Sequence, residues 1–321
     1  MRKVLYLSHA PADVYAIIGE RVPAGFELVT LETPSDEERL AKAADCEVLI
    51  VAAYPLRRPL VDAARKLELV HHQGVGWQDT VDADALQQRH IPLALTPEGT
   101  STGVAEHTVL LMLATLKRLP FADSELRAGR FHVNALRPVS RELSGMTIGY
   151  VGMGRIARAV AERLLPFGVT GLYYDPDVDL APTDAERLGL RKRPLNEVLA
   201  NADILTLHLP LTRATRHLID DAALRSMKPG AFLINTARGG LVEESALARA
   251  LTEGRLAGAG LDVFESEPLP AGHPLAGLPN VVLTPHIAAG TRDALRTKMS
   301  ALFDNVQRFY RGEPLRNQVI P

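Results

Sequence analysis

Apolar and polar positions follow two alternating patterns along the chain. Short apolar runs, typical of strands buried in a parallel sheet, alternate with longer segments in which apolar residues recur every three or four positions, as in helices. This alternation is typical of a parallel α/β domain. In the first hundred residues it predicts strands at 4–7, 26–30, 48–51, 69–71 and 92–95, with helices at 14–19, 36–43, 60–66 and 82–88.

A second series of the same kind begins at Gly145, and an amphipathic helix is predicted after it at 291–310. We therefore expect two α/β domains, with residues 1–100 forming the first, residues 101–287 forming the second, and residues 288–321 returning to the first. The strands predicted in the second series are 147–151, 171–174, 204–207, 231–235, 258–261 and 281–283.

The segment 101–119 is apolar on nearly every face of its predicted helix. Such a helix is buried on all sides, between domains or between subunits. We interpret it as a connector between the two domains and as a contact in a homodimer. A core helix within one domain is about equally compatible with the pattern.

Composition limits the classes of partner. The 321 residues carry 36 Lys and Arg against 38 Asp and Glu, a net charge of -2, which gives no basis for a nucleic-acid or membrane-surface partner. The longest central apolar run, 109–114, is far shorter than the roughly 20 residues that cross a bilayer. The N-terminal segment does not resemble a signal peptide, and Cys46 is the only cysteine. We expect a cytoplasmic protein.

A glycine motif follows the first strand of the second series. The predicted strand 147–151 runs into Gly152-Met153-Gly154-Arg155-Ile156-Ala157 and then into a helix. This G-x-G-x-x-A pattern, between a strand and a helix, is typical of dinucleotide binding. Gly152 would allow the tight turn, and Gly154 would let the backbone approach a pyrophosphate at the helix N-terminus.

The next predicted strand ends at Asp175, about 20 residues after Gly154, where a carboxylate can accept hydrogen bonds from an adenosine ribose and repel a 2′-phosphate. This spacing favours NAD over NADP. The alternative is a glycine turn that serves only helix–strand packing, with Asp175 as a solvated strand end.

Three further segments place polar residues just after predicted strands, where ligands bind in open parallel sheets. They are Asn235–Gly240 with Arg238, Leu261–Pro268 with Glu267, and Thr284–Gly290 with His286. A guanidinium can grip a carboxylate and polarise a neighbouring ketone. An imidazole can donate a proton to the alkoxide that hydride transfer creates, and a neighbouring carboxylate favours its charged form.

Each of these residues alone has a plainer interpretation. Arg238 could form a surface pair, Glu267 could be a solvated loop charge, and His286 could be a structural histidine. The three together, downstream of a dinucleotide motif, favour catalysis: Arg238 as anchor, with Glu267 and His286 as the acid–base pair. No spacing resembles a metal site, and this chemistry needs no metal.

These motifs resemble the D-isomer-specific 2-hydroxyacid dehydrogenase family, which includes glyoxylate/hydroxypyruvate reductases, D-lactate dehydrogenases and phosphoglycerate dehydrogenases. The resemblance extends from about Gly74 to the C-terminus and is most specific at 104–107, 149–157, 235–241, 261–268 and 284–290. It implies a Rossmann-type cofactor domain inserted into a flavodoxin-like substrate domain, a homodimer, and Arg238, Glu267 and His286 as the catalytic residues.

The resemblance also implies the binding residues. The cofactor would contact Gly152, Gly154, Arg155, Ile156 and Asp175, and its nicotinamide would contact Asp262 and the segment Thr236, Ala237 and Arg238. Backbone N–H groups around Val75 and Gly76 would bind the substrate carboxylate together with Arg238. The expected activity is NAD-dependent interconversion of a small 2-oxo acid, such as glyoxylate, hydroxypyruvate or pyruvate, and its D-2-hydroxy acid.

Two departures and two rival functions accompany this interpretation. The loop between Gly76 and Asp82, which includes Trp77, is one residue longer than is usual in the family. Ala52-Ala53-Tyr54 stands where phosphoglycerate-specific members carry a basic residue, which disfavours D-3-phosphoglycerate as the alternative substrate. The rival within the same fold is a dehydrogenase for formate or phosphite, and Glu267 argues against formate because formate-specific relatives carry an amide there. A non-enzymatic NAD(H)-sensing binding protein is the rival from another class.

Overall fold

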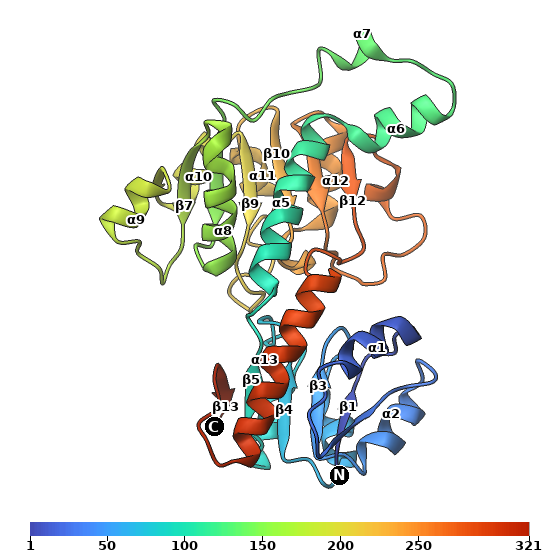
Figure 1. Cartoon of the computed structure of the whole chain (residues 1–321). Helices are drawn as coiled ribbons and strands as arrows, with labels where there is room; N and C mark the ends of the chain where they lie inside the picture. The colour runs from blue at the N-terminus through green and yellow to red at the C-terminus, as the bar shows by residue number, and fades with distance from the viewer. Residues whose placement is uncertain (321) are drawn as a thin grey trace. The chain divides into compact units, whose positions relative to one another are not determined.

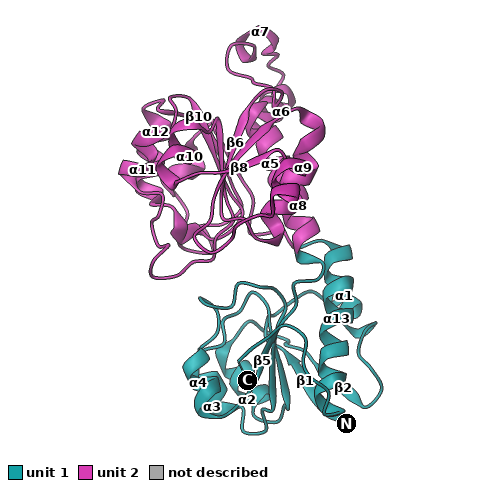
Figure 2. Cartoon of the chain, turned by 90° about the vertical axis from the view of Figure 1, so that its left-hand side faces the viewer, with its two compact units in different colours: residues 1–100, 290–321 teal, residues 101–289 magenta. Residues whose placement is uncertain are grey.

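The computed structural model describes residues 1–320 and divides the chain into two compact units (Figure 2). Unit 1 comprises residues 1–100 and 290–321, and unit 2 comprises residues 101–289. Each unit has one sheet with helices packed on its faces (Figure 1). The predicted α/β fold class with two parallel-sheet domains is therefore confirmed.

The sheet of unit 1 has the strand order β2-β1-β3-β4-β5-β13. All neighbours are parallel except β13, which runs antiparallel to β5. The order of the first five strands is that of flavodoxin-like sheets. The strands are β1 (Arg2–Tyr6), β2 (Phe26–Val29), β3 (Val48–Val51), β4 (Leu69–His72), β5 (Leu93–Leu95) and β13 (Gln318–Ile320); the helices are α1 (Ala12–Gly19), α2 (Asp36–Ala43), α3 (Arg58–Ala63), α4 (Ala83–Gln88) and α13 (Arg292–Tyr310).

Alternating side chains of β1 separate the two apolar layers of unit 1. Val4 and Tyr6 pack with α13 residues such as Met299 and Phe303, whereas Leu5 packs with residues of α2, α3 and α4. This follows from the two-residue period of a strand, which sends successive side chains to opposite faces. The amphipathic C-terminal helix thus covers one face of the sheet formed by the N-terminal part of the chain.

The sheet of unit 2 has the order β8-β7-β6-β9-β10-β11-β12, and every pair is parallel. Its first six strands repeat the Rossmann order, with the topological switch point between β6 and β9. The strands are β6 (Thr147–Val151), β7 (Thr170–Tyr174), β8 (Leu190–Lys192), β9 (Ile204–Leu207), β10 (Ala231–Asn235), β11 (Leu256–Leu261) and β12 (Val281–Leu283). The α-helices are α5 (Thr100–Leu116), α6 (Leu119–Arg127), α7 (Val133–Leu136), α8 (Arg155–Leu164), α9 (Pro182–Arg187), α10 (Leu195–Asn201), α11 (Asp221–Ser226) and α12 (Glu244–Thr252).

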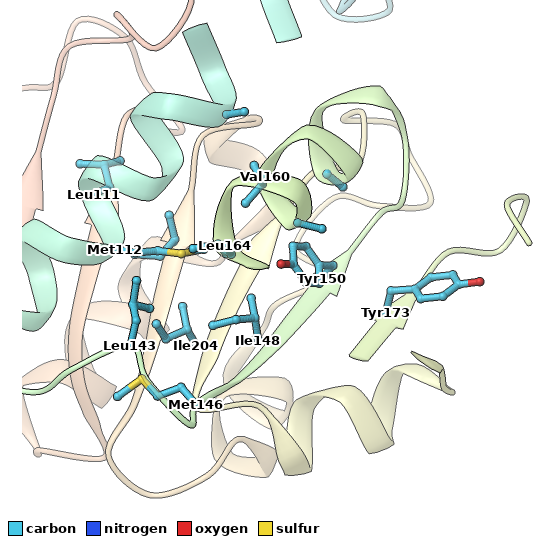
Figure 3. Close-up of a cluster of buried hydrophobic side chains, with 14 of the residues drawn as sticks. Leu111, Met112, Leu143, Met146, Ile148, Tyr150, Val160, Leu164, Tyr173 and Ile204 are labelled. Atoms are coloured by element: carbon cyan, nitrogen blue, oxygen red, sulfur yellow. The ribbon is translucent and has the colours of Figure 1, made fainter. Parts of the chain in front are cut away.

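The helix α5 belongs to the core of unit 2. Leu111 and Met112 of α5 are buried together with Ile148 and Tyr150 of β6 and Ile204 of β9 (Figure 3). Most of the apolar side chains of α5 are therefore buried in the core of one unit, which favours the second interpretation, a core helix within one domain. Leu110 is about half exposed and is not part of this core.

Two short edge strands were not predicted, and two helix bounds differ from the predicted ones. The edge strands β8 and β13 have three residues each, too few to show a period. The helix predicted at 101–119 ends at Leu116, because Arg118 adopts a left-handed backbone with φ 51° before α6 begins. The helix α3 starts earlier than predicted because Pro59 occupies its first turn, which is a favoured place for proline.

Two kinds of feature are absent from the described part of the chain. Across residues 1–320, no helix combines the length and the apolar character needed to cross a bilayer. Within the same residues, no three His, Cys, Asp or Glu side chains are grouped so that they could hold a metal ion.

A buried histidine makes the stability of unit 1 depend on pH. His71 on β4 is fully buried, and its Nε2 lies 3.0 Å from the Asn305 side-chain amide of α13. The Asn305 side-chain oxygen accepts the Arg316 N–H, so the group that faces His71 is the amide nitrogen, which donates. His71 Nε2 must therefore be unprotonated to accept this hydrogen bond. Burial lowers the pKa of His71 from 6.5 to about 3.

We therefore expect stability to fall as the pH is lowered from 6.5 towards 3. In that window the unfolded chain binds a proton that the folded chain excludes, which costs up to about 1.4 kcal/mol per pH unit. Urea unfolding at neutral pH and at pH 5 should show a smaller pH effect for His71→Gln than for the natural protein. Equal pH effects in the two proteins would contradict this prediction.

Candidate active site

The predicted site residues of unit 2 follow neighbouring strands. Arg238 comes after β10, Glu267 after β11 and His286 after β12. Because these strands are parallel and adjacent, their carboxyl ends meet at one edge of the sheet. The glycine turn Gly152–Gly154 leaves β6 at the same edge, beside the switch point.

The glycine turn combines one tight contact with one open position. Gly152 has φ 97°, and a Cβ there would lie 2.7 Å from the His208 carbonyl carbon, just past β9. Gly154 is the N-cap of α8 and has open space where its Cβ would be. No side chain caps α8, and Arg155 in its first turn is exposed while Ile156 is half-buried. Uncapped N–H groups behind an open glycine fit a pyrophosphate.

Asp175 holds the glycine turn in place. Its Oδ2 accepts the Met153 N–H at 2.7 Å, and its Oδ1 accepts the N–H groups of Asp177 and Val178, each at 2.9 Å. The side chain is largely buried. A carboxylate has about four acceptor positions, so one remains beyond these three bonds. Its predicted role as ribose ligand stays a prediction, and the structure adds a role in shaping the turn.

The turn after β10 presents Arg238. Asn235, the last residue of the strand, accepts the Ala237 N–H at 3.0 Å and donates its amide to the Arg238 carbonyl at 2.8 Å. The next residue must be glycine, because a Cβ at Gly239 would lie 1.9 Å from the carbonyl carbon of Phe264. These contacts hold the Arg238 turn against the loop that carries Glu267.

Glu267 and His286 form a direct pair. His286 Nδ1 lies 2.8 Å from Glu267 Oε2, and the other oxygen of Glu267 accepts the Phe264 N–H at 3.0 Å. Both side chains are partly exposed, at 48% for His286 and 37% for Glu267. His286 has φ 53°, a left-handed backbone that costs energy for most residues. The structure thus brings together two of the three residues named from the sequence.

The electrostatic surroundings keep Glu267 ionised. Partial burial by itself would raise its pKa, but the hydrogen bonds from His286 and from Phe264 N–H outweigh that effect. The positive charge of Arg238 also acts on the carboxylate, and the net result is a pKa below the ordinary value of 4.5. Arg238 is therefore near enough to Glu267 for the three side chains to form one electrostatic group.

Asp262 and Thr236 are more deeply buried than Glu267 and His286. Asp262 is completely buried; it accepts the Thr284 hydroxyl at 2.6 Å on Oδ1 and the Ala288 N–H at 2.8 Å on Oδ2. Thr236 is largely buried and its hydroxyl contacts Thr108. The predicted nicotinamide contacts of Asp262, Thr236 and Ala237 stay predictions.

Unit 1 contains the predicted carboxylate-binding loop. Val75 and Gly76 follow β4, and His72 at the end of that strand accepts the Gly74 N–H at 2.9 Å on Nδ1. The proton of the ring then lies on Nε2, which is 3.1 Å from the Thr80 hydroxyl. His72 therefore connects the end of β4 to Thr80 in the 76–82 loop. The substrate-binding role of Val75 and Gly76 stays a prediction.

Tyr54 and the basic side chains near it in unit 1 have structural partners. The Arg39 guanidinium stacks over the Tyr54 ring at 3.7 Å, and the Tyr54 hydroxyl donates to Asp36. Arg57 donates to the Asp79 carbonyl, and Arg58 pairs with Asp82 and Gln88. Arg57 and Arg58 are thus exposed side chains with partners within unit 1.

Several residues have supporting roles that the sequence did not predict. Asn235 fixes the Arg238 turn through hydrogen bonds to its backbone. Glu244, at the start of α12, accepts the Glu265 N–H at 2.8 Å. His107 and Thr284 meet Asp262 beneath the His286 segment. The signal for Asn235 was present, since an Asn that ends a strand before a turn often bonds the backbone two residues on. The long-range partner Glu244 gave no local signal, and the family motif 104–107, which contains His107, did not indicate the contact with Asp262.

Comparisons with known proteins identify the family of this chain. The sequence model described as D-isomer specific 2-hydroxyacid dehydrogenase, NAD binding domain, matches residues 109–288. The glyoxylate reductase of Thermofilum pendens is 40% identical over 285 residues, which cover 87% of this chain and 83% of that protein. The D-3-phosphoglycerate dehydrogenase of Methanocaldococcus jannaschii is 38% identical over 286 residues, which cover 88% of this chain and 53% of that protein.

A solved structure shares the whole fold. The NAD-dependent formate dehydrogenase of Staphylococcus aureus, determined in complex with NAD, superposes with a TM-score of 0.86 at 29% identity and covers 100% of this chain and 99% of that chain. The fold and the site thus define a two-domain protein with a Rossmann-type, NAD-binding domain. The chain belongs to the D-isomer specific 2-hydroxyacid dehydrogenase family.

Family membership confirms the resemblance seen in the sequence and the expectation of NAD as cofactor. The chain spans about half the length of the D-3-phosphoglycerate dehydrogenases that it matches, and more than four-fifths of the glyoxylate reductases.

Proposed function

We propose that this protein is an NAD-dependent dehydrogenase that reduces a small 2-oxo acid, of the glyoxylate, hydroxypyruvate or pyruvate type, to its D-2-hydroxy acid, and catalyses the reverse reaction. The observation that carries the proposal is the 2.8 Å contact between His286 and Glu267 within reach of the charge of Arg238. The similarity to glyoxylate reductases supports the same substrate class.

The cofactor would lie along the glycine turn at the switch point. Gly152, Gly154, Arg155 and Ile156 would hold its pyrophosphate, and Asp175 would bind the adenosine ribose. Thr236, Ala237 and Asp262 would lie on its nicotinamide side. When bound, NADH supplies the hydride that reduces the carbonyl carbon of the substrate.

Arg238 and His286 would divide the remaining chemistry. Arg238 would grip the substrate carboxylate and polarise the ketone with its planar, permanently charged fork. Because Nδ1 of His286 is engaged by Glu267, Nε2 is the nitrogen that remains to donate a proton to the developing alkoxide. Glu267, ionised below its usual pKa, would keep the imidazole charged and oriented. The Val75 and Gly76 N–H groups of unit 1 would assist in carboxylate binding.

The deciding experiment follows NADH absorbance with a panel of acids. We expect turnover with glyoxylate, hydroxypyruvate, pyruvate or a branched 2-oxo acid, and the ranking identifies the substrate. Preference for 3-phosphohydroxypyruvate would instead favour the phosphoglycerate alternative, and NAD reduction by formate would favour the formate dehydrogenases. Tight NADH binding without turnover of any acid would instead favour the hypothesis of a non-enzymatic NAD(H)-sensing protein.

The pH profile tests the pairing of Glu267 with His286. Reduction needs a protonated imidazole, and the carboxylate stabilises that form, so Glu267→Gln should move the upper pH limit of 2-oxo acid reduction downward by about one or two pH units. Glu244→Gln is a suitable comparison, since Glu244 holds the same loop without touching His286. Identical upper limits in Glu267→Gln and the natural enzyme would argue against the pair.

We also propose that the protein is a homodimer. Exposed apolar side chains gather in the segment 119–139, which projects from the rest of unit 2 (Figure 1), and Phe131 is 78% exposed. The same segment supplies most of the lining of an apolar hollow of about 340 Å³, including Phe121, Leu136 and Val139. Clustered exposed apolar surface of this kind marks interaction sites, and a second copy would cover it.

The dimer is tested by light scattering after gel filtration. We expect the mass of two chains for the natural protein and of one chain for Phe131→Glu. A natural protein that elutes as a monomer would overturn the proposal.

A cytoplasmic location stays a prediction.

A further inference from the structure

Helix α5 carries two buried polar side chains on the face that packs against the site segments. The helix is otherwise mostly apolar, yet Thr108 is completely buried and the His107 side chain is only 11% exposed. Glycine brings the helix and this edge close together: a Cβ at Gly103 would lie 3.0 Å from the Ala288 carbonyl oxygen. The placement of polar groups at this contact requires partners, since unpaired buried groups are costly.

His107 is linked to the backbone around His286. The Thr284 hydroxyl donates to Asp262 at 2.6 Å and lies 2.9 Å from His107 Nε2. Since the hydroxyl has one proton and gives it to the carboxylate, His107 Nε2 must be the donor in the second bond. His107 Nε2 also lies 3.4 Å from Asp262 Oδ1, so it supports the carboxylate directly.

Asp262 carries this support to His286. Its carboxylate accepts the N–H groups of Ile287 at 2.9 Å and Ala288 at 2.8 Å, and its backbone carbonyl accepts the His286 N–H at 2.7 Å. Three successive backbone N–H groups are thus bonded to one residue. They hold His286 at φ 53°, a conformation that a histidine does not favour by itself. Hydrogen bonds from His107, Thr284 and these N–H groups keep the pKa of Asp262 below its usual value despite the opposing effect of burial.

Thr108, the next residue, is linked to the Arg238 turn. Its hydroxyl donates to the Val104 carbonyl at 2.7 Å and lies 2.9 Å from the Thr236 hydroxyl. With its proton used, Thr108 accepts from Thr236, which lies two residues before Arg238. Adjacent residues of one helix therefore fasten two different site segments, one with His286 and one with Arg238.

We infer that His107 and Thr108 are positioning residues, which act on the reaction through His286 and Arg238 respectively. The inference deepens the proposed function and rests on it. Neither residue touches the Glu267–His286 pair in the structure; each fixes the backbone from which a reacting side chain projects. Because a displacement of about 1 Å can cost on the order of 100-fold in rate, such bonds have measurable consequences.

The two residues should fail in different ways. His107→Leu should lower kcat about 10- to 100-fold with KM for the 2-oxo acid little changed, because His286 acts on the transferred proton. Thr284→Val breaks the same chain of bonds and should give the same loss, without adding to that of His107→Leu. Thr108→Val should chiefly raise KM for the 2-oxo acid, because Arg238 holds the substrate. Thr108→Ser keeps the hydroxyl and should have a KM near that of the natural enzyme. Glu106→Gln, an exposed neighbour on α5, is the matched control.

A double-mutant cycle separates positioning from general damage. If His107 acts through His286, His107→Leu should cause no further loss of kcat in a His286→Asn background. An equal loss in both backgrounds would overturn the inference for His107. For Thr108, a Thr108→Val enzyme with natural KM would do so.

A second measurement needs no enzymatic activity. In His107→Leu, the amide hydrogens of Ile287 and Ala288 should exchange with solvent at least about tenfold faster than in the natural protein. Unchanged protection of these two amides would overturn the inference even if the proposed function holds. Faster exchange in a protein that reduces no 2-oxo acid would instead retain the structural link and reject the proposed function.

Discussion

Replacing His286 by asparagine is expected to lower the turnover of 2-oxo acid reduction by about 100- to 10,000-fold, the range typical of losing a general acid. In the proposed mechanism the imidazole donates the proton from Nε2, because Nδ1 contacts Glu267. The affinity for NADH should stay essentially unchanged, since the glycine turn and Asp175 lie on other strands. Stopped-flow kinetics and NADH fluorescence titration measure the two quantities.

Asparagine is preferred to alanine here because of the backbone. At φ 53°, asparagine is tolerated, whereas alanine would add strain to the loss of the ring. His90→Asn is the matched control: it makes the same change at the same φ, at an exposed position after α4 in unit 1. A His286→Asn enzyme that keeps natural turnover would remove this residue from the proposed mechanism.

The architecture could be predicted because its signals are local. The buried strands β3, β6, β9 and β10 are predominantly apolar runs, and the observed bounds equal the predicted ones. The glycine motif between β6 and α8 also identifies the start of a Rossmann unit by itself. The strand order then follows from the few topologies that parallel α/β chains adopt.

Elements whose signals are weak could not be predicted. The edge strand β8 exposes two of its three residues, and α6 follows α5 after only the Lys117–Arg118 break. A hydrophobic pattern does not reveal a left-handed residue such as Arg118, because that conformation depends on what the flanking helices pack against. The all-round apolar character of α5 was ambiguous for a similar reason: burial has no direction in a sequence.

The candidate site shows the same division. Arg238, Glu267 and His286 could be named because polar residues after parallel strands meet at one sheet edge, and Glu267 and His286 do lie in contact. The residues that hold these side chains in place could not be predicted. Glu244 and His107 contact the site segments from α12 and α5, which are distant in the sequence. Asp175 shows a third case, in which one carboxylate at the predicted position also shapes the turn through Met153.

Replacing Arg238 by glutamine is expected to lower kcat/KM for 2-oxo acids about 100- to 1,000-fold, as the removal of a preorganised charge from a transition state usually does. The guanidinium would serve both the carboxylate and the developing alkoxide, so KM should rise and kcat should fall together. Steady-state kinetics with the preferred acid of the panel gives both constants. The fold of the turn should survive, because Asn235 bonds the backbone carbonyl of residue 238 and not its side chain.

Arg238→Lys separates the charge from the fork. Lysine keeps the positive charge that acts on Glu267, so the upper pH limit of reduction should stay near that of the natural enzyme. It loses the bidentate geometry, so KM should still rise, because a point charge cannot replace two parallel hydrogen bonds to a carboxylate. If Arg238→Gln bound and reduced the 2-oxo acid as the natural enzyme does, the anchor would have to lie elsewhere, and the group around Glu267 and His286 would lack its proposed substrate contact.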